Sequence, residues 1–150
     1  MRAVIQRVSK ASVEIENKIN GQIQIGLLIL LGIEDSDTQQ DIDWLSRKII
    51  QMRIFSDADG KMNLSLQEVN GNILLISQFT LFASTKKGNR PGFTRSAKPE
   101  FAIPLYEQFI KTLEIQLDKK IQTGIFDADI KVQLLNDGPV TIIMDSKNPE

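Results

Sequence analysis

Three polar side chains, those of Ser77, Gln78 and Thr80, interrupt a long apolar stretch in the second half of the chain. The stretch runs from Asn72 to Ala83 and contains β-branched and aromatic residues, which predicts one long buried strand rather than a helix. A hydroxyl or amide group taken out of water without a partner costs roughly 1 to 3 kcal/mol. The polar side chains must therefore satisfy one another or be completed by a ligand, and we favour a ligand site.

The composition limits the chemistry that such a site could perform. The chain of 150 residues has no cysteine and no histidine, so thiolate chemistry and the commonest general base are both excluded. Without an adjacent base, the hydroxyl of Thr80 is a weak nucleophile at neutral pH. Catalysis here requires a substrate that is already activated, so that positioning and an oxyanion site suffice, or a substrate that carries its own hydroxyl. An aminoacyl ester on RNA meets both requirements.

A basic segment follows the polar stretch and predicts a long functional loop. From Ser84 to Pro99 there is no acidic residue, and glycine and proline keep the segment out of regular structure. Because the net charge of the chain is only −1, any contact with nucleic acid must be local. A solvated charged loop without a partner is the alternative. The side chains that would track phosphates and stack on a base are Lys86, Lys87, Arg90, Phe93 and Arg95.

The remaining sequence predicts one α+β domain over residues 1–150, with an antiparallel, barrel-like sheet and two main helices. Alternating side chains indicate two short strands between Ala3 and Glu16, broken near Ser9 and Lys10. Amphipathic helices are expected from about Thr38 to Met52 and, after a short first turn at Pro99, from about Pro104 to Lys119. Further strands are expected at 21–25, 27–33, 130–135 and 140–144.

Other side chains with chemical potential have structural explanations. The acidic residues before the first helix suit an N-cap and dipole role better than a metal site, because no ligands converge on them. Tyr106 is expected in the core rather than in catalysis. Judged by residue types alone, Asn136-Asp137-Gly138-Pro139 is a hairpin turn between the last two strands. We expect no metal and no cofactor.

Two segments taken together resemble a known family. Ser77-Gln78-Phe79-Thr80-Leu81, combined with Asn136-Asp137-Gly138-Pro139-Val140-Thr141, closely resembles the paired signature of the D-aminoacyl-tRNA deacylases. The opening Met1-Arg2-Ala3-Val4-Ile5-Gln6-Arg7-Val8 and the segment Lys87-Gly88-Asn89-Arg90-Pro91-Gly92-Phe93 are also similar to that family. The resemblance covers essentially the full length, and two motifs at this separation form a more specific signal than either alone.

The resemblance implies a homodimer with a barrel-like α+β fold and active sites at the subunit interface. It implies that Gly138-Pro139 is a cis dipeptide inserted into the partner's pocket, where its carbonyl oxygens exclude an L side chain, and that Arg7 orients this dipeptide. Thr80 and Gln78 would be the catalytic positions, with Thr80 as nucleophile or with attack assisted by the 2′-hydroxyl of the terminal adenosine. The missing base favours the second route. The pocket floor would consist of Ser77, Gln78, Phe79 and Thr80, with the N–H groups near Phe79 and Thr80 receiving the oxyanion.

The implied function is hydrolysis of the ester bond of D-aminoacyl-tRNA in the cytoplasm. The implied partners are the aminoacylated 3′ end of tRNA and a second copy of the chain, but not DNA or a membrane. A pocket that excludes side chains should admit glycine, so glycyl-tRNA, including glycine mischarged on tRNA-Ala, is an expected side substrate. Two alternatives stay open: a non-catalytic tRNA-binding module of translation that uses the basic loop, and a purely structural oligomer.

Overall fold

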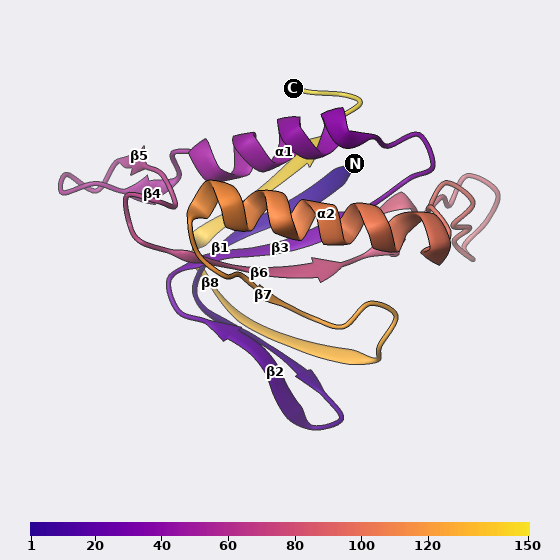
Figure 1. Cartoon of the computed structure of the whole chain (residues 1–150), viewed down its shortest axis with the longest axis horizontal. Coiled ribbons are helices and arrows are strands. Elements are labelled where there is room, and N and C mark those ends of the chain that lie inside the picture. Colours follow the sequence, from indigo (N-terminus) through magenta and orange to yellow (C-terminus); the bar gives the residue numbers. More distant parts are fainter.

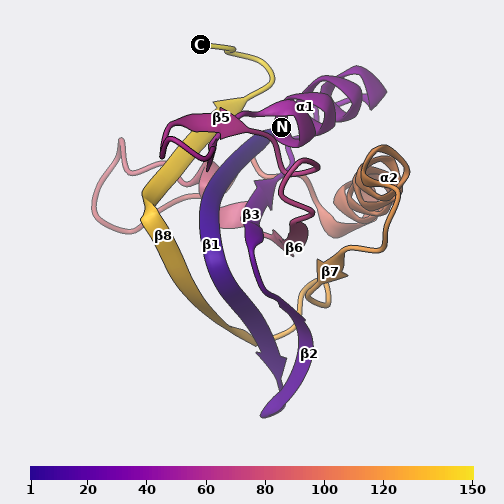
Figure 2. The same cartoon turned by 90° about the vertical axis from the view of Figure 1, so that its left-hand side faces the viewer.

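One long strand, β1 (Arg2–Ile15), organises the main sheet in the computed structural model, which describes residues 1–150. The first half of β1 pairs antiparallel with β3 (Gly26–Gly32), and its second half pairs antiparallel with β2 (Lys18–Ile23). On its other edge, β1 pairs antiparallel with β8 (Ile130–Asp145) over almost its whole length. Figure 2 shows β1 and β8 bending together, which gives the sheet its curved, barrel-like form.

The sheet continues beyond β3 with parallel strands. β6 (Asn72–Ser77) pairs parallel with β3, and β7 (Gln122–Thr123) pairs parallel with β6, so the six-stranded sheet is mixed. Nearly every residue of β3 and β6 is buried, which explains why both strands read as continuous apolar runs. A Cβ added at Gly26 would lie 1.9 Å from the carbonyl oxygen of Asn72, so only glycine allows this close approach. A separate two-stranded hairpin is formed by β4 (Phe55–Ser56) and β5 (Met62–Leu64).

Two helices, α1 (Gln39–Gln51) and α2 (Pro99–Leu117), lie side by side over one face of the sheet (Figure 1). The main hydrophobic core fills the space between these helices and the sheet. Tyr106 of α2 is buried there, and its hydroxyl donates to the carbonyl of Leu75 at 3.0 Å. Burial raises the pKa of Tyr106, so the phenol stays protonated and the predicted core role is confirmed. Neither helix combines the length and hydropathy that a membrane crossing requires.

The α+β class, the barrel-like sheet and the first helix are confirmed, but the breaks predicted within β1 and β8 were both wrong. β1 continues through Ser9 and Lys10, because irregular pairing on either side of Val8 keeps it joined to β8. β8 likewise runs through residues 136–139 as one strand, so the predicted hairpin turn does not exist. The extra residues form a bulge opposite Arg7 instead, which allows both halves of β8 to pair with β1.

The second helix also differs from its predicted bounds. It begins at Pro99 and continues through Pro104, instead of restarting there, and it ends at Leu117. Proline at position 104 lacks one backbone donor, but the buried face of α2, which extends from Ala102 to Leu117, stabilises the helix on both sides of that position. The helix stops where Asp118 adopts a left-handed conformation with a φ of 54°.

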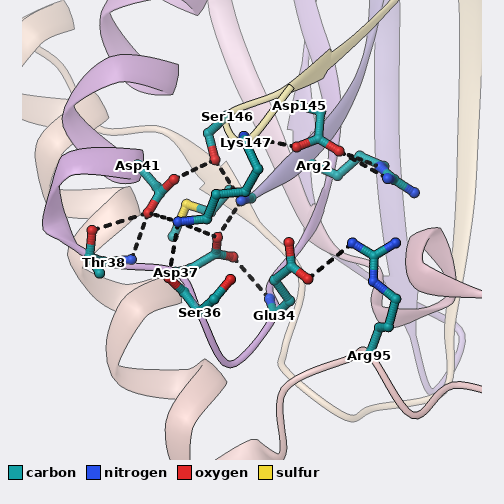
Figure 3. Close-up of polar contacts among 11 residues, drawn as sticks. Arg2, Glu34, Ser36, Asp37, Thr38, Asp41, Arg95, Asp145, Ser146 and Lys147 are labelled. Atoms are coloured by element: carbon teal, nitrogen blue, oxygen red, sulfur yellow. Dashed lines mark hydrogen bonds and ion pairs between the residues drawn. The ribbon is translucent and has the colours of Figure 1, made fainter. Parts of the chain in front are cut away.

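A polar network joins the beginning of β1 and the segment after β8 to the start of α1 (Figure 3). The amino group of Met1 donates to Asp37 and, at 2.7 Å, to the hydroxyl of Ser146. Asp41 accepts hydrogen bonds from Ser146 at 2.6 Å and from Lys147 at 2.8 Å. Asp41 also accepts from the N–H of Thr38 at 2.8 Å, so the capping box consists of Thr38 and a carboxylate inside α1 rather than one of the acidic residues before the helix.

The carboxylates of this network respond differently to burial. Burial opposes ionisation of Asp41, but the hydrogen bonds from Lys147, Ser146 and Thr38 outweigh it and lower the pKa of this carboxyl below its usual range. Burial raises the pKa of Asp37, although the Met1 ammonium partly offsets the effect. Asp41 is therefore the member of the network whose charge stabilises the fold at neutral pH.

Replacing Asp41 by Asn should lower the free energy of unfolding at neutral pH by about 1 to 3 kcal/mol, because hydrogen bonds to a charged acceptor are weakened. A pKa lowered in the folded state stabilises the protein above the ordinary carboxyl value of 3.8, and this contribution is lost as the pH falls below it. In urea denaturation, the free energies of unfolding of the variant and the wild type should therefore converge as the pH falls into the acid range.

A matched control for this experiment is Asp129→Asn, which removes an exposed ion pair with Lys131 and should leave stability unchanged. A stability difference between Asp41→Asn and wild type that persists undiminished near pH 2 would contradict the assigned direction of the pKa shift.

Candidate active site

The polar stretch found in the sequence lies where β6 ends and a short 3₁₀ helix, η1 (Phe79–Phe82), begins. The N–H of Gln78 donates to the carbonyl of Leu31 at 2.8 Å, which extends the ladder between β3 and β6 by one more bond. Gln78 then turns the chain out of the strand with a φ of −145° and a ψ of 82°. The predicted strand from Asn72 to Ala83 was therefore wrong beyond Ser77, because the residues that follow form local bonds instead of ladder bonds.

The hydroxyl of Thr80 accepts a hydrogen bond from the side-chain amide of Gln78 at 2.5 Å. An amide cannot remove the hydroxyl proton, and the chain contains no histidine that could. The first internal bond of η1 runs from the N–H of Leu81 to the carbonyl of Gln78, so the N–H groups of Phe79 and Thr80 have no acceptor within this helix. The turn thus offers backbone donors and oriented polar groups rather than an activated nucleophile.

A cavity of about 330 Å³ opens beside this turn. Most of its lining residues are hydrophobic and a few are polar, which is the usual character of a small-molecule pocket. The lining comes from β3, the end of β6, the residues around the start of α2 and the segment before β8: Leu31, Ile33, Ser77, Gln78, Phe79, Ala97, Ala102, Ile125, Phe126, Asp127, Ala128, Asp129 and Ile130.

The cavity wall formed by residues 125–130 escaped the sequence analysis. The N–H of Gly124 donates to the carbonyl of Leu75 at 3.3 Å, and the ring of Phe126 packs edge to face against Tyr106 with centroids 6.0 Å apart. The sequence signals only a turn here, with Gly124 followed by two apolar residues and then by Asp127-Ala128-Asp129. Packing between distant segments is what brings this wall to the end of β6.

The aromatic residue of the basic loop folds back onto the site. The ring of Phe93 lies edge to face with the ring of Phe79, with centroids 5.1 Å apart. The hydroxyl of Ser96 donates to the carbonyl of Phe79 at 2.7 Å. The side chain of Phe79 nevertheless remains 56% exposed, which is unusual for a large apolar residue next to a cavity.

The basic residues of the loop fall into two groups. The guanidinium of Arg95 donates to the carboxylate of Glu34 at 3.1 Å and lies 5.2 Å from the ring centroid of Phe82, so it holds the loop against η1. The other basic side chains near the tip are exposed to solvent: Lys86, Lys87 and Arg90.

The second signature forms the bulge in β8, and Arg7 of β1 lies beneath it. The peptide bond between Gly138 and Pro139 is cis, as the resemblance implies. The side chain of Arg7 is buried; its Nε donates to the carbonyl of Asp137 at 2.7 Å and its Nη1 to the carbonyl of Ile54 at 2.5 Å. One guanidinium therefore ties the bulge to the segment that precedes β4.

The bulge is also closed across its base by Asn136, which was part of the signature but not among the predicted site residues. Its side-chain oxygen accepts from the N–H of Val140 at 2.8 Å, and its amide donates to the carbonyl of Val140 at 3.1 Å. Gly138 has a φ of 145°, and a Cβ there would lie 2.7 Å from the side chain of Val140. Asn136 and Arg7 thus hold an exposed loop of backbone in one shape.

The two signatures lie far apart within the chain. Ser77 is paired with Leu31, Leu31 with Ala3, and Ala3 with Met144, so three strand spacings separate Ser77 from β8. Gly138 lies in the bulge opposite Arg7, four positions along β1 from Ala3, which adds about 13 Å along the strand at the usual rise per residue. In Figure 1, β6 points toward the right-hand side, whereas β8 bends at the left-hand side. The two signatures therefore do not meet within one copy of the chain.

Comparisons with known proteins identify the family. The model of the family described as D-Tyr-tRNA(Tyr) deacylase matches residues 4–145. The chain is 65% identical to a D-aminoacyl-tRNA deacylase of Flavobacterium johnsoniae and 64% identical to one of Cytophaga hutchinsonii, over the full length of each.

Solved structures show the same fold. A structure titled c-Myc DNA Unwinding Element Binding Protein superposes with a TM-score of 0.90 at 38% identity, covering 97% of this chain and 98% of the other. A probable eukaryotic D-amino acid tRNA deacylase superposes with a TM-score of 0.82 at 16% identity, covering 95% of this chain and 97% of the other, and supports the fold alone. Together with the full-length identities to curated relatives, the match of the family model places this chain in the D-Tyr-tRNA(Tyr) deacylase family.

Proposed function

We propose that this protein hydrolyses the ester bond of D-aminoacyl-tRNA at a pocket shared between two copies of the chain. The observation that carries the proposal is that the two signature segments lie in separate parts of the chain. The cavity beside Ser77 opens to solvent, whereas the bulge at Gly138 and Pro139 is exposed in another part of the molecule. A symmetric dimer can bring the bulge of one copy to the cavity of the other.

The free edge of β8 supports a second copy as the partner. This strand of 16 residues pairs only with β1, so its other edge has no hydrogen-bonding partner. A long unpaired strand edge is rarely left uncovered in a protein that stays monomeric. Its large apolar residues are exposed in the single chain, with Ile143 at 69% and Leu135 at 54%. Exposed apolar side chains on such an edge are candidates for burial against a second copy.

Chiral selection is assigned to the backbone of the bulge rather than to side chains. Arg7 holds the carbonyl of Asp137, and Asn136 holds the backbone of Val140, so the Gly138-Pro139 dipeptide between them has little freedom to move. An L side chain directed at the carbonyl oxygens of this dipeptide would meet both a steric and an electrostatic barrier. A D side chain points away from this wall. Glycine has no side chain to exclude, and glycyl-tRNA is therefore a side substrate in this proposal, including glycine mischarged on tRNA-Ala.

Catalysis is assigned to positioning and to the substrate's own hydroxyl. Thr80 is hydrogen-bonded to an amide and has no base, which disfavours a covalent threonine ester. The N–H groups of Phe79 and Thr80 can receive the developing oxyanion, and the 2′-hydroxyl of the terminal adenosine assists the attack. Lys86, Lys87 and Arg90 contact the tRNA backbone in this arrangement, whereas Arg95 holds the loop through Glu34. Charged tRNA is a cytoplasmic substrate, and the proposed location is the cytoplasm.

The substrate assignment is tested with three esters in one assay: D-tyrosyl-tRNA, L-tyrosyl-tRNA and glycyl-tRNA. We expect rapid loss of the D ester and no enzyme-dependent loss of the L ester. The glycyl ester should be cleaved more slowly than the D ester, so that its loss requires a higher enzyme concentration. Protection of all three esters would instead support a non-catalytic tRNA-binding module. Complete resistance of glycyl-tRNA at high enzyme concentration would refute exclusion by a backbone wall.

The catalytic assignment is tested with Thr80→Ala and Thr80→Ser on D-tyrosyl-tRNA. Both variants should keep kcat within about tenfold of wild type, because a hydroxyl that only orients the ester contributes modestly. A tRNA ending in 2′-deoxyadenosine should be cleaved much more slowly by every variant. Loss of activity in Thr80→Ala that is restored in Thr80→Ser, or an acyl-enzyme trapped on wild type, would establish the covalent route instead.

The shared pocket is tested with Gly138→Ala, whose added Cβ would lie 2.7 Å from Val140 and 3.0 Å from Arg7 at a φ of 145°. The distorted bulge should reduce kcat/KM for D-tyrosyl-tRNA by about tenfold or more. Gly92→Ala is the matched control, because an added Cβ meets nothing within 4 Å there, and it should be fully active.

Subunit mixing then decides whether bulge and cavity come from different copies. Gly138→Ala is mixed with Ala97→Phe, whose ring would fill the cavity. Refolding the two inactive variants together should restore about a quarter of wild-type activity, since half of the dimers are mixed and each has one intact site. If no activity returns while mixed dimers form, each pocket is built within one copy.

A further inference from the structure

The end of η1 is held by a side chain that neither signature contains, Arg2 at the start of β1. Its Nη1 donates to the carbonyl of Leu81 at 2.9 Å. Its Nε and Nη2 both donate to the same carboxylate oxygen of Asp145 in β8, at 3.2 and 2.9 Å. Figure 3 shows the contact between Arg2 and Asp145. One guanidinium thus joins the first and last strands of the sheet to the helix that holds Thr80.

The carbonyl of Leu81 needs such a partner because η1 stops at Phe82. In a continuing 3₁₀ helix this carbonyl would accept from the N–H of Ser84. That N–H donates instead to the carbonyl of Gly92 at 2.8 Å, where the basic loop closes on itself. The carbonyl of Leu81 therefore accepts no hydrogen bond from the helix backbone, and the charged guanidinium of Arg2 donates to it instead.

Arg2 also contacts the last residue of η1. Its guanidinium carbon lies 4.9 Å from the ring centroid of Phe82, and that of Arg95 lies 5.2 Å from the same ring. Phe82 is almost completely buried, and a Cβ added at Gly32 would lie 3.0 Å from its ring. With two cations and the backbone of β3 against it, this ring has one available position.

We infer that Arg2 is a positioning residue for the deacylation site: by bridging Asp145 and the carbonyl of Leu81, it sets the place of η1 and with it the backbone donors of Phe79 and Thr80. The catalytic part of this inference rests on the proposed function. Its structural part, the ordering of η1 by Arg2, does not.

A planar fork is required for this role. The Leu81 carbonyl and the Asp145 carboxylate are contacted by different edges of one guanidinium, whereas the ammonium of lysine is a compact charge on a flexible stem. Arg2→Lys should therefore fail to restore what Arg2→Met removes. A residue that only supplied charge to the Asp145 ion pair would be replaced adequately by lysine.

The first measurement is amide hydrogen exchange of Leu81 and Ala83, whose N–H groups donate to the carbonyls of Gln78 and Thr80 at 3.2 and 3.0 Å. In Arg2→Met both amides should exchange about tenfold faster or more, as expected for a local opening. The amide of Ile5, which lies in the β1 and β3 pairing, should be unchanged. Equal acceleration at Ile5 would mean general destabilisation and would overturn the inference.

The second measurement is steady-state cleavage of D-tyrosyl-tRNA. Arg2→Met and Arg2→Lys should lower kcat about tenfold or more with KM within about twofold of wild type, because displaced donors affect the transition state rather than tRNA binding. Lys120→Ala, which removes the Lys120 to Glu114 ion pair at 2.9 Å, is the control and should match wild type.

The two measurements separate the possible failures. Unchanged exchange at Leu81 and Ala83, or a lysine variant equal to wild type in both assays, would overturn the role of Arg2. A wild-type protein that leaves D-tyrosyl-tRNA intact would refute the proposed function, and the exchange experiment would still decide whether Arg2 orders η1.

Discussion

Pairing of β1 along both of its edges is the constraint on which the rest of this molecule depends. The strand holds β3 and β2 on one side and β8 on the other, so it fixes the relation between the first and last segments of the chain. Arg2 and Arg7 are separated by five positions, an odd number, and therefore point to opposite faces of the strand. Arg2 reaches the carbonyl of Leu81, and Arg7 reaches the carbonyl of Asp137.

Both arginines act on backbone carbonyls, and this agrees with a site that uses backbone more than reactive side chains. The hydroxyl of Thr80 has an amide donor as its neighbour, and no imidazole exists in the chain. An ester that is already labile needs orientation and oxyanion donors, both of which depend on where the backbone lies. A bulge held by Arg7 and a helix held by Arg2 are two solutions to the same problem, which is to keep irregular backbone in one place.

Much of the fold could be predicted from local patterns. The helix ending near Met52 was found because its apolar spacing and its cap at Thr38 agree. The buried strands β3 and β6 were found because parallel strands covered on both faces are apolar throughout. Predictions were wrong where local preference and tertiary contacts disagree. Residues 78–83 resemble a strand in composition, but the ladder with β3 extends only as far as Gln78, and Arg2 and Ser96 then bind the exposed carbonyls of η1.

The sequence by itself determined the candidate chemistry and the family. The missing histidine excludes a conventional nucleophile, and the signatures at 77–81 and 136–141 resemble those of the family whose model matches residues 4–145. Only the tertiary structure decided that 136–139 is a bulge in a continuous strand, that residues 125–130 form a wall of the cavity, and that the two signatures lie apart in the folded chain. The physical reason is that residue types restrict which reactions are available locally. The distance between two segments depends instead on strand order and register, and these are set by pairings among residues far apart in the sequence.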